Sequence, residues 1–128
     1  MTAPSLAAWA GLAAAVWTLA FQLLLAGGAP LGALASGGQD RGRLPRAKRF
    51  ASLASAFLLA AIASMFGQAA GLWRLWPEAS LPWLFGLVAA LFALSFVGNL
   101  ASRSRPERLH GVPLTAILAI YLGLLAAF

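Results

Sequence analysis

Apolar segments without a single charged residue, each 17 to 23 residues long, recur four times along this 128-residue chain. They cover residues 6–26, 50–72, 84–100 and 112–128. An α-helix rises 1.5 Å per residue, so about 20 residues cross the roughly 30 Å hydrocarbon core of a bilayer. Because backbone polar groups in lipid must be satisfied within each segment, we expect each to be helical. The sequence therefore predicts an all-α fold, a single domain (residues 1–128) that forms a four-transmembrane-helix bundle with short loops.

The composition supports an integral membrane protein. The chain is 62% hydrophobic and 9% charged, whereas soluble domains are about 45–50% apolar and about 25% charged. Cysteine is absent, which excludes disulfides, thiolate metal sites and thiol redox chemistry. The net charge of +6 would suggest nucleic-acid binding in a soluble protein. Here the cations lie in two short loops without interleaved aromatic residues, so we expect no nucleic-acid partner.

Two features of the N-terminal part have competing interpretations. The segment 6–26 could be a signal peptide, but no Lys or Arg precedes it and the run is too long for such a leader. Pro4 fits the first helical turn, and Gly27 with Gly28 predicts the helix end. The following segment, residues 28–38, is too short to span a membrane and too apolar for an ordinary loop. It is either a linker on the membrane surface or a re-entrant half-turn.

The distribution of basic residues predicts the orientation. The first loop holds Arg41, Arg43, Arg46, Lys48 and Arg49, the third holds Arg103, Arg105 and Arg108, and the second holds only Arg74. The positive-inside rule then places the first and third loops in the cytoplasm and both termini outside. We expect a multi-pass protein of a bacterial cytoplasmic (inner) membrane, with anionic lipid headgroups bound at the five cations of the first loop. The Trp-rich connection 73–83 is typical of the opposite membrane interface.

Small residues at helical spacing indicate where helices pack. The rows are Ser52, Ala56, Ala60, Ser64 and Gln68; Ala63, Gly67 and Gly71; Ala7, Gly11 and Ala15; and Ala119, Gly123 and Ala127. Serines and a glutamine continue the first row, so it predicts that the helix 50–72 is central in the bundle. We also expect a homo-oligomer, because a transporter of this size needs a second protomer to enclose a path.

Groups for acid–base or metal chemistry are few. Asp40, Glu78 and Glu107 are the carboxylates, and Glu107 forms a Glu-x-x-His unit with His110. Di-iron bundles contain that unit twice with two further carboxylates, so we predict no metal site and no cofactor. No phosphate loop or Ser-His-acid set can be assembled, which argues against an enzyme.

The amides within the apolar segments suggest a ligand site. Gln22 and Asn99 lie near the same end of their predicted helices, close to the third loop. The candidate ligand-binding residues are Gln22, Asn99, Arg103, Arg105, Glu107 and His110. This set would give uncharged amides below a layer of cations, which suits an amphipathic ligand. The alternative is that both amides only bond neighbouring helices.

Three stretches of the chain resemble a known pattern. They are G-A-P-L-G-A-L-A-S-G-G from residue 28, the basic L-P-R and N-L-A-S-R-S-R-P-E-R from residue 99. Together they are similar to uncharacterised small four-span membrane proteins of high-GC bacteria, and this resemblance implies architecture but no activity. Two function classes therefore remain: binding or transport of a lipid-like small molecule, or a structural or accessory membrane subunit without a ligand site.

Overall fold

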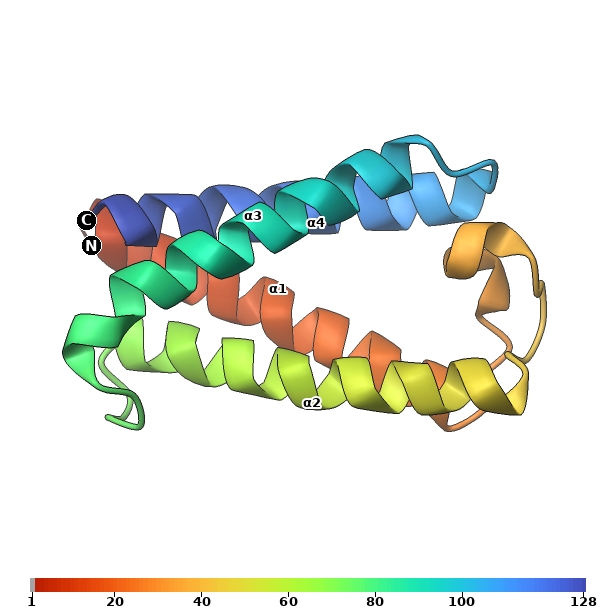
Figure 1. The fold of residues 1–128 in the computed structure, drawn as a ribbon, viewed down its shortest axis with the longest axis horizontal. Helices are drawn as coiled ribbons and strands as arrows, with labels where there is room; N and C mark the ends of the chain where they lie inside the picture. The colour runs from red at the N-terminus through yellow and green to blue at the C-terminus, as the bar shows by residue number, and fades with distance from the viewer. Residues whose placement is uncertain (1) are drawn as a thin grey trace.

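The computed structural model describes residues 2–128, and the side chains of all of these except Ser36. Within this range the chain forms four long helices and no strand (Figure 1). They are α1 (Ala3–Ala26), α2 (Arg46–Ala69), α3 (Leu81–Leu100) and α4 (Arg105–Ala127). Three short 3-10 turns lie in the connections: η1 (Gly32–Leu34), η2 (Ser36–Gly38) and η3 (Glu78–Ser80). With η3 counted into the third, each long helix is long and apolar enough to cross a membrane. The predicted all-α bundle of four candidate spans is therefore confirmed.

All four helices begin earlier than hydropathy predicted, α1 and α3 by three residues each, at Ala3 and Leu81. α2 begins at Arg46 instead of residue 50 and ends at Ala69 instead of residue 72. α4 begins at Arg105, seven residues before residue 112. A long cationic side chain can extend from a helix end towards water, so charge does not end the helix where it ends the apolar run. Local bonds set the ends instead, since the Ser104 hydroxyl oxygen accepts from the backbone N–H of Glu107.

The helices form two antiparallel pairs that are joined through α1 and α4. Close backbone contacts connect α1 with α2, α3 with α4, and α1 with α4. In Figure 1, α1 crosses from the side of α4 at the end with the two termini to the side of α2 at the other end. Among residues 2–128, α2 has no comparable backbone contact with α3 or α4. The prediction that the second helix is central is therefore confirmed only in burial, since α2 buries the largest share of its apolar segment, 44%. In backbone contacts α1 and α4 are the central helices, because each has two close neighbours.

The packed core fills only one half of the bundle. Its buried members come from the ends of the helices near the termini, and include Ala7, Phe66, Phe85 and Leu122. The Phe66 ring bridges α2 and α3, with its centroid 6.1 Å from that of Phe85. Side chains therefore connect α2 and α3 at this end although their backbones stay apart.

The small-residue rows have different roles. Ala7, Gly11 and Ala15 are buried in the core, and a Cβ on Gly11 would collide with the ring of Phe66. Close packing was predicted for this row and is confirmed. Gly67 instead makes room for the indole of Trp73, and Gly71 has a φ of +87° just after the end of α2. In that Gly-x-x-x-Gly unit, Gly67 therefore accommodates the Trp73 side chain and Gly71 ends the helix. Neither glycine packs against another helix.

Gln68 organises the Trp-rich connection between α2 and α3. Its side-chain oxygen accepts from the backbone N–H groups of Leu75 (2.8 Å) and Trp76 (2.7 Å), and its amide nitrogen donates to the carbonyl of Trp76 (2.8 Å). Ser64 accepts the indole N–H of Trp76 at 2.9 Å. Ser64 and Gln68, two polar residues of the α2 small-residue row, therefore bind the connection that follows the helix. Their spacing of four residues indicated a shared face but not this partner.

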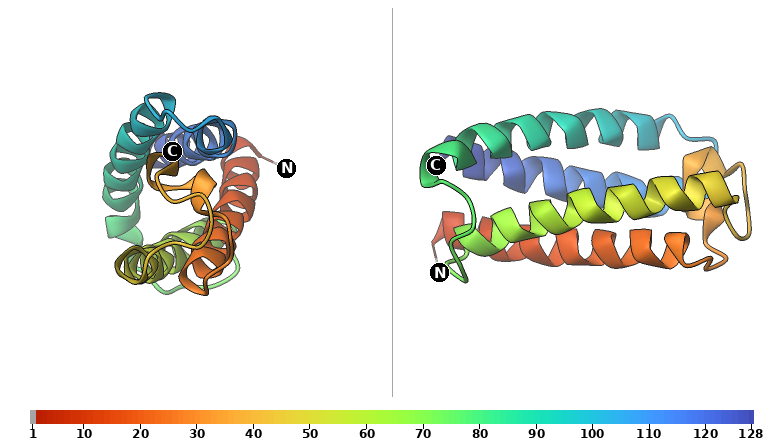
Figure 2. Two further views of the ribbon diagram at one scale, coloured as in Figure 1. Left: turned by 90° about the vertical axis from the view of Figure 1, so that its right-hand side faces the viewer. Right: turned by 60° about the horizontal axis from the view of Figure 1, so that its bottom comes forward.

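The connection between α1 and α2 forms a folded cap. Figure 2 (left) shows this segment lying across the end of the bundle, and η1 and η2 contact α4. Leu31, Leu34 and Ala35 pack against a small apolar cluster of Phe21, Leu25 and Leu44. The segment 28–38 thus folds over the end of the bundle, with its apolar side chains partly buried against the end of α1 and the loop itself. Whether it is a surface linker or a re-entrant half-turn depends on its depth in the membrane.

Candidate functional site

A cavity of about 420 Å³ lies in the half of the bundle that the core leaves unfilled. Every long helix contributes to its wall, and the cap closes it with Leu34 and Ala35. The polar lining residues are Thr18, Gln22, Lys48, Ser52, Ser55, Ser95, Asn99, Glu107, His110 and Thr115. The main apolar lining residues are Phe21, Leu25, Leu58, Leu59, Leu91, Phe92, Leu114 and Leu118.

The cavity wall changes from polar to apolar along the bundle axis. Near the capped end, α2 presents Ser52 and Ser55, and towards the middle it presents Leu58 and Leu59. On α3 the order is Asn99 and then Phe92, again counted from the capped end. This order holds on α2 and α3 but not on α1, which presents Leu25, Gln22, Phe21 and Thr18 from the capped end. The cap itself contributes the apolar Leu34 and Ala35. Such a wall matches a ligand with a polar head and an apolar tail.

Both predicted amides line this cavity. Asn99 donates to the backbone carbonyl of Ser95, one turn earlier on its own helix, at 2.9 Å. It also packs against Gly111 of α4, where a Cβ would collide with the Asn99 carboxamide. Gln22 makes no hydrogen bond to any residue in the range 2–128. Neither amide forms a hydrogen bond between helices in that range, so the carboxamide of Gln22 and the oxygen of Asn99 are available to a ligand.

His110 and Glu107 line the same cavity from α4. Nε2 of His110 accepts the indole N–H of Trp17 at 2.9 Å, and its ring lies 4.5 Å from that of Phe21 between centroids. One oxygen of Glu107 accepts the hydroxyl of Ser102 at 2.8 Å. Because α4 begins at Arg105, Glu107 and His110 both belong to the helix. Residues three positions apart lie on the same face of a helix, as predicted for the Glu-x-x-His unit.

The two predicted arginines face a different cavity. Arg103 and Arg105 line a space of about 540 Å³ between the cap and the start of α4, together with Arg41. The structure therefore divides the predicted site: four residues lie in the amphipathic cavity and two lie in this basic cavity. Sequence alone could not separate them, because the division depends on where the cap folds.

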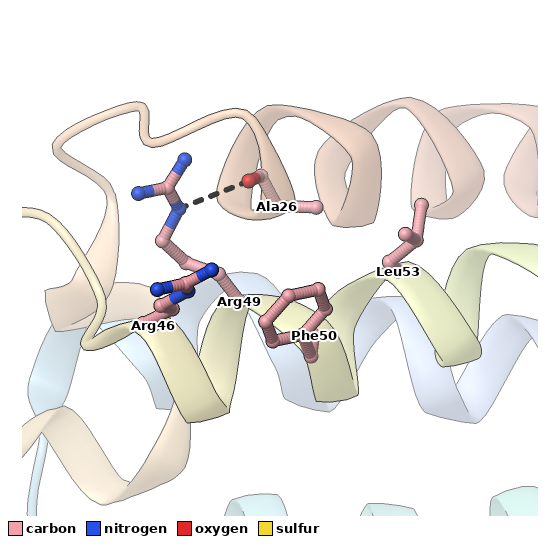
Figure 3. Close-up of a pocket in the computed structure, with 5 residues that line it drawn as sticks. All are labelled: Ala26, Arg46, Arg49, Phe50 and Leu53. Carbon is pink, nitrogen blue, oxygen red and sulfur yellow. Dashed lines mark hydrogen bonds between the residues drawn. The ribbon is translucent and has the colours of Figure 1, made fainter.

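The first-loop cations are partly engaged within the protein. Lys48 pairs with Asp40 at 2.6 Å. Arg49 Nε donates to the carbonyl of Ala26 at 3.0 Å, at the wall of a small cavity of about 230 Å³ (Figure 3). That carbonyl is in the last turn of α1, where a cation is favoured by the helix dipole. Arg46 lies 5.8 Å from the ring centroid of Phe50.

Several lining residues were not predicted as part of a site. Lys48, Ser52, Ser55 and Ser95 all face the amphipathic cavity. A signal was present in the sequence, since Ser52 with Ser55 and Ser95 with Asn99 are spaced by one helical turn at matching depths. The hydroxyls of Thr18 and Thr115 bond to carbonyls of their own helices, Ala14 and Gly111 respectively, both at 2.7 Å. This is the expected behaviour of hydroxyls inside apolar helices.

The site offers binding groups more than reactive ones. Nowhere in residues 2–128 do three or more His, Asp or Glu residues lie close enough together to hold a metal ion. Uncharged amides, hydroxyls and one imidazole can orient a polar head by hydrogen bonds, and the leucines and phenylalanines can enclose a tail. The fold and the cavity are those of a multi-pass, four-helix membrane bundle with an amphipathic cavity in the half near the cap. No protein-family model, curated protein or solved structure matches the chain.

Proposed function

We propose that this chain is a multi-pass protein of a bacterial inner membrane that binds or transports an amphipathic, lipid-like small molecule. The ligand occupies the amphipathic cavity, and the positive-inside distribution of cations turns the capped end of that cavity to the cytoplasm. The observation that carries the proposal is one cavity lined by polar and apolar side chains from all four long helices, with a polar-to-apolar order on α2 and α3.

The two amides support a binding role because neither forms a hydrogen bond between helices within residues 2–128. A carboxamide that only joined helices would use its hydrogen-bonding groups on a neighbouring helix, since such bonds stabilise membrane bundles by about 0.6 kcal/mol on average. Asn99 bonds instead within α3. With Gln22 at similar depth on α1, the pair presents donors and acceptors to whatever fills the cavity.

The arrangement of α2 and α3 supports a membrane-derived ligand. The backbones of these two helices are not in close contact, and both contribute residues to the cavity wall. A ligand with an apolar tail could pass between them from the lipid without exposing that tail to water. A cavity of about 420 Å³ falls in the range of roughly 300–1,000 Å³ that is usual for small-molecule sites.

The competing function is a structural or accessory subunit, and the last helix supports it. Gly123 of α4 has no neighbour within 4 Å of where its Cβ would be. Ala119 and Ala127 lie one turn away on either side, and neither is buried. A row of small residues without a partner is suited to a helix from a second protomer or another subunit.

Native mass spectrometry in mild detergent separates the two functions, because it reports stoichiometry and retained ligand together. We expect the wild-type chain to retain lipid-like molecules, and Gln22→Leu and Asn99→Leu to retain fewer while the fold stays assembled. Ser55→Phe should fill the cavity and have the same effect. The matched control is Ala54→Phe, at an exposed neighbouring position that does not line the cavity.

Two outcomes would contradict ligand binding. One is that both leucine variants keep the same ligands as the wild type but unfold at lower temperature, which would make the amides structural. The other is that Ser55→Phe and Ala54→Phe retain equal amounts of ligand. Either result, with a stable oligomer in the spectrum, would favour the accessory subunit.

A further inference from the structure

The basic cavity between the cap and α4 brings together cations that are far apart in the chain. Its lining residues are Ala33, Gly37, Gly38, Arg41, Arg103, Ser104, Arg105 and Pro106. Arg41 belongs to the connection between α1 and α2, whereas Arg103 and Arg105 flank Ser104 at the start of α4. Three guanidinium groups therefore share one concave surface of about 540 Å³.

These three arginines have no counter-charge within the structure. No carboxylate lines the cavity. Of the carboxylates near this end, Asp40 is paired with Lys48 and Glu107 accepts the hydroxyl of Ser102. Within residues 2–128, the single ion pair is that of Lys48, and no hydrogen bond involves the side chains of Arg41, Arg103 or Arg105. Like charges gathered without a partner destabilise the fold unless an anion from outside joins them.

Two other arginines near this end form hydrogen bonds to the protein backbone. Arg108 donates to the carbonyl of Ser102 at 2.6 Å, and Arg49 donates to that of Ala26 at 3.0 Å. The arginines of the basic cavity are exposed instead. Arg43 and Arg74, which lie outside this cavity, are exposed as well. What distinguishes Arg41, Arg103 and Arg105 is that they line one cavity with their N–H groups free to donate to a ligand.

The walls of the basic cavity are fixed to one another. The hydroxyl of Ser104 donates to the carbonyl of Ala33, which ties α4 to η1. Gly38, with a φ of +73°, lies so close to Ser104 that a Cβ there would collide with the serine side chain. Ser104 also caps α4, whose first turn carries the positive end of the helix dipole. The backbone segments that carry Arg41, Arg103 and Arg105 are thus joined through Ser104 around one cavity.

We propose that the basic cavity binds a phosphate group, held between the guanidinium of Arg41 on the cap and those of Arg103, just before α4, and Arg105, at its first residue. A guanidinium matches phosphate through two parallel N–H···O bonds, so three of them can surround one such group. The volume exceeds that needed for a bare anion, so the ligand is a phosphate ester, either a lipid headgroup or a soluble compound. This site is separate from the amphipathic cavity and does not depend on the proposed function.

The test is a binding measurement on the full chain, purified in neutral detergent and depleted of lipid. One arm titrates glycerol 3-phosphate by calorimetry. The other counts short-chain phosphatidylglycerol retained in native mass spectra against phosphatidylcholine. Arg41→Gln, Arg103→Gln and Arg105→Gln should each weaken binding of the preferred probe about tenfold, since a hydrogen bond to a charged group typically contributes that much. Arg41→Lys should weaken it too, because an ammonium cannot donate a parallel pair of bonds.

The matched control is Arg43→Gln, which removes the same charge from the same loop outside the cavity. Binding of phosphatidylglycerol alone would assign the site to a lipid headgroup, and binding of glycerol 3-phosphate would assign it to a soluble ester. The proposal is overturned if neither probe binds. It is overturned equally if Arg43→Gln weakens binding as much as Arg103→Gln, because the attraction would then come only from the net positive charge of that face.

Discussion

The indole N–H of Trp17 donates to Nε2 of His110 across 2.9 Å, and so joins α1 to α4 at the edge of the amphipathic cavity. The two residues are 93 positions apart. A tryptophan can only donate, so this bond requires an imidazole that is unprotonated at Nε2. The ring of Phe21 packs on the same imidazole, and together these contacts orient His110 within the wall.

Trp17→Phe should lower the free energy of unfolding by about 1 kcal/mol, the usual contribution of one hydrogen bond. Thermal unfolding in detergent measures this difference. Trp9→Phe is the control, since Trp9 is a partly exposed indole on the same helix and has no hydrogen bond to any residue from 2 to 128. Equal losses for the two variants would show that the bond to His110 contributes nothing.

Acidification should break the same bond. The neutral imidazole accepts from Trp17, and the protonated one has no free acceptor, so this contribution is present at high pH and is lost as the pH falls through the titration of His110. The fluorescence of Trp17 should change over that range. Glu107 and Lys48 are the charged residues that line the same cavity. The change should be absent in His110→Gln, and its persistence there would assign it to another group.

Gly11→Ala should destabilise the bundle, whereas Gly123→Ala should not. A Cβ on Gly11 collides with the Phe66 ring, and overpacking of this kind costs about 1–3 kcal/mol. Gly123 has open space around it, so alanine there should stabilise its helix by roughly 0.5–1 kcal/mol. Unfolding temperatures of the two variants should move in opposite directions. Shifts of the same sign would contradict the contact with Phe66.

Gln68→Leu should loosen the connection between α2 and α3. Leucine leaves two backbone N–H groups, of Leu75 and Trp76, without their acceptor, and each such loss costs about 1–3 kcal/mol when the group is buried. Faster proteolysis of this connection and a shifted tryptophan emission would report the change. Gln22→Leu, another glutamine in an apolar helix, should leave both readouts unaltered because Gln22 has no such bonds.

Cysteine labelling in intact cells tests the orientation. Gly42→Cys, at an open position in the first loop, should be shielded from an impermeant thiol reagent, and Ala79→Cys, exposed in the Trp-rich connection, should react. The native chain has no cysteine, so the background is clean. Labelling of residue 42 with protection of residue 79 would reverse the orientation inferred from the basic loops.

Hydropathy was enough to predict the class of fold, because in lipid each apolar segment must satisfy its own backbone and has no alternative to a helix. It failed at helix ends. Arg46 and Arg105 begin their helices although they are charged, since a terminal side chain can reach water while its backbone remains helical. The end of an apolar run and the end of a helix are therefore set by different physical effects.

Chain order and spacing also placed Gln22, Asn99, Glu107 and His110 near one end of the bundle, and the structure brings those residues to a common cavity. Tertiary contacts alone decided the rest. The cap folds over the bundle end through Leu34 and the Ser104–Ala33 bond, and it separates Arg103 and Arg105 from the other four. Small-residue spacing pointed to α2 as the centre of the bundle. α2 does bury the largest share of its apolar segment, but α1 and α4 are the helices with two close neighbours each. The spacing of small residues identifies a helix face that another helix can approach closely. Which helix packs there is decided by contacts over the whole bundle, such as that of Phe66 with Gly11.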